Sequence, residues 1–153
     1  MKSLLGFLGL LLLAGGLAHP AHAATTTVTL SVRRSTLQAG CVPQAFHRHG
    51  PGQVRVRVGT PIVVVARTSA YLSRSTYHLK IVDMRSRRVR GLNAVLIDCV
   101  TSPCRSEYFA GDPSRERLMA WVYNPQVPIG RPERELGHSA PITVTQYGPR
   151  CIT

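Results

Sequence analysis

The segment Gln53–Arg67 reads QVRVRVGTPIVVVAR and carries a clear structural signal. Valine and arginine alternate from Val54 to Val58, and this two-residue period is typical of a strand with one buried and one exposed face. Pro61–Arg67 is a denser apolar run, as expected of a central strand in a sandwich. The segment therefore predicts two consecutive β-strands.

Similar short runs, separated by Gly, Pro and Ser, make up most of the remaining chain, and helical periodicity is nearly absent. The expected strands are Thr27–Val32, Val54–Val58, Pro61–Arg67, Tyr77–Met84, Ala94–Cys99, Cys104–Phe109, Leu118–Tyr123 and Pro141–Tyr147. About seven to eight short strands at this spacing predict an all-β, antiparallel β-sandwich.

The N-terminus has the order of a secretory signal peptide. Lys2 precedes the apolar run Leu4–Leu13, and Ala21-His22-Ala23 offers small residues at a cleavage site. A membrane anchor is the alternative, but the run is short for a span of about 20 residues. We expect residues 1–23 to be a cleaved signal and residues 24–153 to be a single secreted domain, extracellular or periplasmic, without a membrane anchor.

Four cysteines follow the signal, and an even number in an exported chain predicts disulfides. Three connectivities are possible. The residues between Cys99 and Cys104 are typical of a turn, which favours a bridge across a hairpin and leaves Cys41 to pair with Cys151. A zinc site is the alternative, but only one cysteine pair is close in the sequence.

The chain is strongly basic, with 19 Lys and Arg against 7 Asp and Glu and a formal net charge of +12. Loss of Lys2 with the signal leaves +11. Such a chain favours anionic surroundings, among them cell-wall polymers, acidic glycans, lipid headgroups and nucleic acid. The alternative is that a GC-rich genome favours Arg over Lys. This would explain the ratio of Arg to Lys, but not the shortage of Asp and Glu.

The arginines form a pattern. Arg55 and Arg57 share one face of their predicted strand, and four more crowd the loop after Tyr77–Met84, namely Arg85, Arg87, Arg88 and Arg90. Guanidinium groups hold phosphates or carboxylates by paired hydrogen bonds, so this loop is a candidate binding site for an anionic partner. A solvated turn is the alternative. No specific nucleic-acid partner is expected, because the loop has no aromatic residue to stack on bases.

Five segments in order resemble a known family. They are Gly59-Thr60-Pro61-Ile62, the strand Tyr77–Asp83, a Cys-x₄-Cys pair, Ala-Trp-Val-Tyr at Ala120–Tyr123, and Ser139–Thr145. Their order and spacing resemble the secreted immunoglobulin-like domains of bacteria, over roughly Gly59–Tyr147. The resemblance implies an immunoglobulin-like fold and says little about function, because such sandwiches carry many unrelated functions.

Two features depart from that family, and one expectation follows from it. Cys41–Val58 looks like an insertion, and Gln146 stands where the family usually has Trp. The immunoglobulin-like strand order and shared parity predict that Trp121 packs in the core, against Ile62, Val64, Leu79 and Ile81, with Tyr77 at the edge of the layer.

No catalytic signature is present. Acid–base chemistry needs poised carboxylates, but the favoured interpretation of each acid is pairing with an arginine; the acids are Asp83, Asp98, Glu107, Asp112, Glu116, Glu133 and Glu135. His47-Arg48-His49 could ligate a metal, although a solvated loop is favoured because no acid lies close in the sequence. We therefore expect that the protein is not an enzyme and that it has no catalytic residue, metal or cofactor.

The sequence predicts a secreted, non-enzymatic immunoglobulin-like module with a binding or structural role and an unknown partner. One alternative is a cationic effector that binds anionic envelope polymers. Another is a periplasmic inhibitor or immunity protein, for which the long segment Asn124–Ser139, with Ile129 and Leu136, is the candidate contact loop. An enzyme with dispersed acids is a third, and it predicts two perturbed carboxylates in one cleft.

Overall fold

The computed structural model describes residues 25–38, 41, 43–84, 94–108 and 112–151. Within these ranges the chain forms ten strands and one 3₁₀ turn: β1 (Val28–Arg34), β2 (Phe46–Arg48), β3 (Gln53–Arg57), β4 (Ile62–Thr68), β5 (His78–Asp83), β6 (Ala94–Cys99), β7 (Cys104–Tyr108), β8 (Ser114–Tyr123), η1 (Pro132–Arg134), β9 (Glu135–His138) and β10 (Ile142–Tyr147). The expected signal at residues 1–23 lies outside the described residues.

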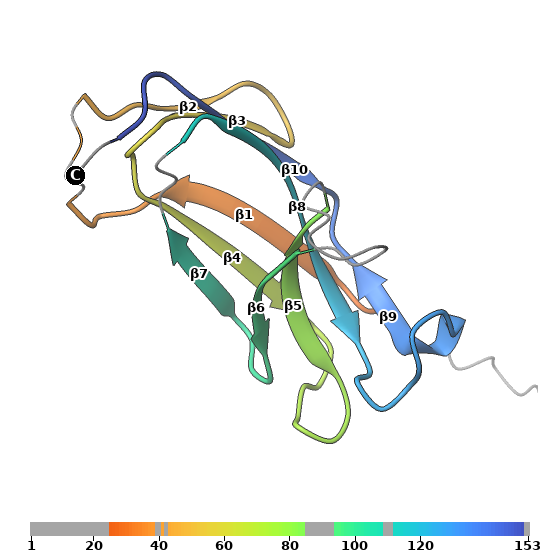
Figure 1. Ribbon diagram of the computed structural model, residues 1–153. Coiled ribbons are helices and arrows are strands. Elements are labelled where there is room, and N and C mark those ends of the chain that lie inside the picture. Colours follow the sequence, from red (N-terminus) through yellow and green to blue (C-terminus); the bar gives the residue numbers. More distant parts are fainter. Residues whose placement is uncertain (1–24, 39–40, 42, 85–93, 109–111, 152–153) are drawn as a thin grey trace, which may run out of the picture.

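The strands form two sheets that face each other (Figure 1). The smaller sheet has the order β1-β4-β7, and the larger has the order β2-β3-β10-β8-β5-β6, with β9 paired to β8. The predicted all-β sandwich is therefore confirmed. The orders β1-β4-β7 and β10-β8-β5 correspond to A-B-E and G-F-C in an immunoglobulin sandwich.

The expected strands are all present, and the structure adds two short ones. β2 and β9 have three and four residues, too few to show an alternating pattern. β8 also begins at Ser114, earlier than the sequence indicated. Within the segment Cys41–Val58, the strands β2 and β3 belong to the larger sheet, because β3 pairs with β10 in parallel and β2 pairs with β3.

The core lies between the sheets and follows from the two-residue period. Val54 and Val56 of β3 face inward with 6% and 1% of their surfaces exposed, while Arg55 between them is exposed. In β4, the alternating inward side chains belong to the same buried cluster as those of β5 and β8. Fully burying each of these side chains contributes about 1.5–3 kcal/mol; the most buried include Ile62, Val64, Leu79, Ile81, Leu118, Val122 and Val144.

The disulfides have the predicted pairing, Cys41–Cys151 and Cys99–Cys104. The hairpin expected at Cys99 and Cys104 is not formed. β6 pairs with β5 in the larger sheet, whereas β7 pairs with β4 in the smaller one, so each strand completes a different sheet edge. This disulfide therefore links the two sheets. Two disulfides are typical of a chain that folds in an oxidising compartment.

Gly59 turns the chain between β3 and β4 beside the long disulfide. Its φ of +85° is in the left-handed region that favours glycine. A Cβ at this position would lie 2.5 Å from Cys41 Cβ and 3.1 Å from Cys151 Sγ. The disulfide can pack here only because residue 59 has no side chain.

Candidate ligand-binding groove

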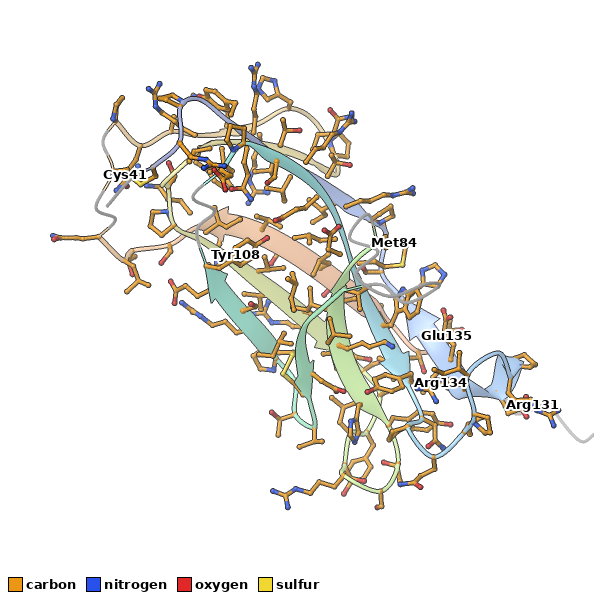
Figure 2. All side chains as sticks on the ribbon, in the orientation of Figure 1. Cys41, Met84, Tyr108, Arg131, Arg134 and Glu135 are labelled. Carbon is orange, nitrogen blue, oxygen red and sulfur yellow. A yellow bond between two sulfur atoms is a disulfide. The ribbon has the colours of Figure 1, made fainter. Side chains whose placement is uncertain are left out.

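A groove of about 780 Å³ lies on the outer face of the larger sheet. Its floor comes from β5, β6 and β8, and one wall comes from residues 129–137, which lead through η1 into β9. Figure 2 shows Arg131, Arg134 and Glu135 together in this wall, at the opposite end of the sandwich from Cys41. The groove is therefore built from segments far apart in the sequence.

Trp121 belongs to the groove floor and not to the core, so the core prediction for it is wrong. Lys80 is its direct partner across β5 and β8, and both side chains point away from the smaller sheet. Val122 and Ala120 on either side of Trp121 are fully buried and pair with Leu79 and Ile81. The prediction failed because Leu118–Tyr123 is almost wholly apolar, and such a run does not reveal its inward face.

Cations lie against the aromatic rings of the groove. Lys80 Nζ lies 5.1 Å from the Trp121 ring centroid and 4.1 Å from that of Tyr123. Arg134 Cζ lies 5.1 Å from the Tyr123 centroid. Both arrangements are within the range of cation–π attraction. Burial lowers the pKa of Lys80, and the positive charge of Arg134 lowers it further.

Two polar partners fix the Tyr123 ring at the end of the groove. Its hydroxyl donates a hydrogen bond to Asp98, which also lies 3.2 Å from Nδ1 of His78. The His78 ring meets the Tyr123 ring edge-on, with centroids 5.7 Å apart. Burial, followed by the interaction with Asp98, raises the pKa of Tyr123 to about 12. Tyr123 is thus held as a neutral phenol in one orientation.

Exposed aliphatic side chains surround this aromatic and cationic centre. Ile129 is 73% exposed, Val95 is 54% exposed and Leu136 is 40% exposed, and all three line the groove. Two of them come from the segment that the sequence singled out as a contact loop. A cluster of exposed aliphatic groups around a ligand-sized hollow is characteristic of binding surfaces.

The other candidate residues are placed as follows. Arg85, Arg87, Arg88 and Arg90 lie outside the described residues, so their anionic site stays a prediction. His47 and His49 are exposed, with ring centroids 6.4 Å apart. Among the described residues, no group of three or more His, Cys, Asp or Glu side chains is placed to hold a metal.

Most of the described acids have partners, only some of which are arginines. Arg105 pairs with Glu107, and Arg150 pairs with Asp112. Asp98 instead contacts Tyr123 and His78, and Glu116 accepts a 2.6 Å hydrogen bond from the Tyr108 hydroxyl. The expectation of arginine partners is therefore correct for two acids and wrong for these others, because β-strand packing brought aromatic partners closer.

Sequence reasoning did not single out three residues of the groove, Lys80, Tyr123 and Arg134, although Arg134 lies within the predicted contact loop Asn124–Ser139. Lys80 had a usable signal, because its alternation with Leu79 and Ile81 places it on the outer face. Tyr123 and Arg134 had none, since their contact depends on how the segment after β8 folds back.

Comparison with protein-family models, curated proteins and solved structures finds no match to this chain. In the part of the chain that the structure describes, no helix is long and apolar enough to cross a membrane.

Proposed function

We propose that this chain is a secreted, non-enzymatic, immunoglobulin-like binding protein whose groove takes an exposed segment of a partner protein. The observation that carries the proposal is the Lys80–Trp121–Tyr123 floor, with cations over aromatic rings and exposed aliphatic side chains around them. Secretion is supported by the signal-like N-terminus and by two disulfides.

The groove chemistry favours a partner segment that carries an acidic side chain beside apolar ones. Ile129, Val95 and Leu136 offer apolar surface, while Lys80, Arg131 and Arg134 outnumber the single carboxylate of the lining, Glu135. A partner carboxylate would meet Lys80, which is half removed from water and therefore interacts more strongly than a fully solvated lysine. Buried aromatic and Arg side chains are also the commonest binding hot spots.

A non-enzymatic role is supported by how the carboxylates are placed. An enzyme with dispersed acids requires two poised carboxylates facing one cleft. Of the described acids, Glu135 alone lines the groove. Glu116 and Asp83 influence each other electrostatically, but they point between the sheets, and Asp83 is 7% exposed.

The test uses a peptide library selected against the full mature chain. Because Trp121 is the chain's single tryptophan, its fluorescence reports groove occupancy directly. We expect selected peptides to combine an acid with aliphatic or aromatic residues and to shift this fluorescence. Lys80→Met and Ile129→Asp should each weaken binding about tenfold or more, since hot-spot residues cost 2 kcal/mol or more when lost.

Leu37→Asp is the matched control, because Leu37 is 56% exposed but lies in the segment after β1, outside the groove lining. It should leave peptide affinity unchanged. Selected peptides that lack an acid, or that bind Leu37→Asp as weakly as Ile129→Asp, would contradict the proposal.

A further inference from the structure

A second surface lies on the same outer sheet face, at the β2–β3–β10 side. Strand register aligns four outward residues in one row: His47 pairs with Arg55, Arg55 with Thr145, and Thr145 with Arg115. Neighbouring strands lie about 4.8 Å apart, so the row extends about 14 Å across the sheet. The intervening residues, such as Val54 and Val144, point into the core.

A parallel row lies beside the first. Gln53 pairs with Thr143, which pairs with Arg117. On the other side, Arg57 pairs with Tyr147. Because side chains two residues apart share a face, these rows are about 7 Å from the first. The surface therefore presents four arginines, with neutral hydrogen-bonding side chains between them.

No described carboxylate forms a salt bridge with any of the four arginines. The salt bridges between described residues involve His78, Arg105, His138 and Arg150, and none involves Arg55, Arg57, Arg115 or Arg117. Glu116, which lies between Arg115 and Arg117 in the sequence, points inward to Tyr108. Like charges this close repel one another, so the surface favours a polyanion that neutralises several of them together.

The surface is also hollowed around Arg115. One shallow pocket of about 260 Å³ includes Arg55, Arg115, Thr143 and Thr145 in its lining. A second, of about 440 Å³, includes Arg115, Arg117 and Thr143. The two pockets share Arg115 and Thr143, so they form neighbouring subsites suited to successive units of one polymer.

The side chains distinguish among polyanions. Arginine holds carboxylate and phosphate groups by paired hydrogen bonds, whereas the Thr and Gln side chains between the arginines match sugar hydroxyls and so favour an acidic glycan. Stacking on bases is disfavoured, because Arg55 Cζ lies 4.6 Å over the Tyr147 ring and covers it. We propose that this face, defined by Arg55, Arg57, Arg115, Arg117, Thr143 and Thr145, binds an acidic polysaccharide.

The experiment measures retention of the full mature chain on immobilised polygalacturonate and dextran sulfate at several salt concentrations. Neutral dextran is the uncharged control, and polyphosphate and single-stranded DNA are the other polyanions. We expect binding to one or both acidic glycans. The double variant Arg55→Gln/Arg115→Gln should reduce affinity at least tenfold and flatten the salt dependence, because fewer counterions are released.

Arg33→Gln/Arg67→Gln removes the same charge from exposed positions on the smaller sheet and should change affinity less than twofold. Lys80→Met in the groove should have no effect, which separates this site from the proposed partner groove. Three outcomes would overturn the inference: no retention on either acidic glycan, equal losses in the two double variants, or equally tight and equally Arg55-dependent binding of polyphosphate and DNA.

Discussion

At the scale of single residues, the position of Trp121 determines what the larger sheet can do. Its neighbours Ala120 and Val122 fill the core, so its ring lies outside and provides a surface for Lys80. Successive side chains of a strand point to opposite faces. A shift of one position along the strand therefore separates a tryptophan that packs in the core from one that can contact a ligand.

Trp121→Ala should destabilise the fold by only about 1 kcal/mol, as is typical of a side chain outside the core. Leu79→Ala, at a fully buried position, should cost about 2–5 kcal/mol because it leaves a cavity. Urea unfolding, monitored by circular dichroism, compares the two variants. A cost for Trp121→Ala as large as that for Leu79→Ala would contradict its placement outside the core.

At the scale of elements, β8 contributes side chains to three environments: the arginine face, the groove and the core between the sheets. Its outward side chains run from Arg115 and Arg117 to Trp121 and Tyr123, so one strand contributes to both proposed surfaces. Its inward side chains are apolar except near the start, where Glu116 lies between the sheets. Burial raises the pKa of Glu116, and Asp83 raises it further, although the hydrogen bond from Tyr108 acts against this.

This raised pKa predicts how stability changes with pH. A carboxyl group whose pKa is higher in the folded state than in the unfolded state ionises more easily in the unfolded chain. Ionisation of that group therefore favours unfolding. Stability is therefore lost as pH rises from the unfolded pKa of about 4.3 through the folded value. Glu116→Gln keeps an acceptor for Tyr108 without the charge, so it should raise the melting temperature at pH 7 but not at pH 3.5.

The measurement is thermal unfolding of wild type and Glu116→Gln at both pH values, with Glu133→Gln as an exposed control that should change neither melting temperature. A loss of stability at pH 7 in Glu116→Gln would show that the ionised form of Glu116 stabilises the fold.

At the scale of the whole molecule, the two disulfides act over different lengths of chain. Cys41–Cys151 joins residues 110 apart in the sequence, whereas Cys99–Cys104 joins residues 5 apart. The long bridge attaches the segment before β2 to the segment after β10, and so secures the β2–β3 side of the larger sheet, which bears Arg55 and Arg57.

By chain entropy, removing the long bridge should cost about 4–5 kcal/mol and removing the short one about 2 kcal/mol. Cys41→Ser/Cys151→Ser and Cys99→Ser/Cys104→Ser are compared by guanidinium unfolding under non-reducing conditions. The explanation fails if the short bridge contributes more. The long-bridge variant should also lose more of its glycan retention than of its peptide binding, because the groove lies at the opposite end of the sandwich.

The sequence by itself determined the all-β class and the positions of the longer strands, because alternation and turn residues are local properties. It also favoured the observed cysteine pairing, although the hairpin from which that pairing was argued is not formed. Alternation also placed Arg55 and Arg57 on one face. Only the tertiary structure decided that β6 and β7 complete different sheets and that Trp121 points outward. It also decided that Lys80, Tyr123 and Arg134 meet in one groove. These features depend on pairing between strands distant in the chain. Alternation along a strand shows which side chains share a face, but it does not specify which other strand will be the partner.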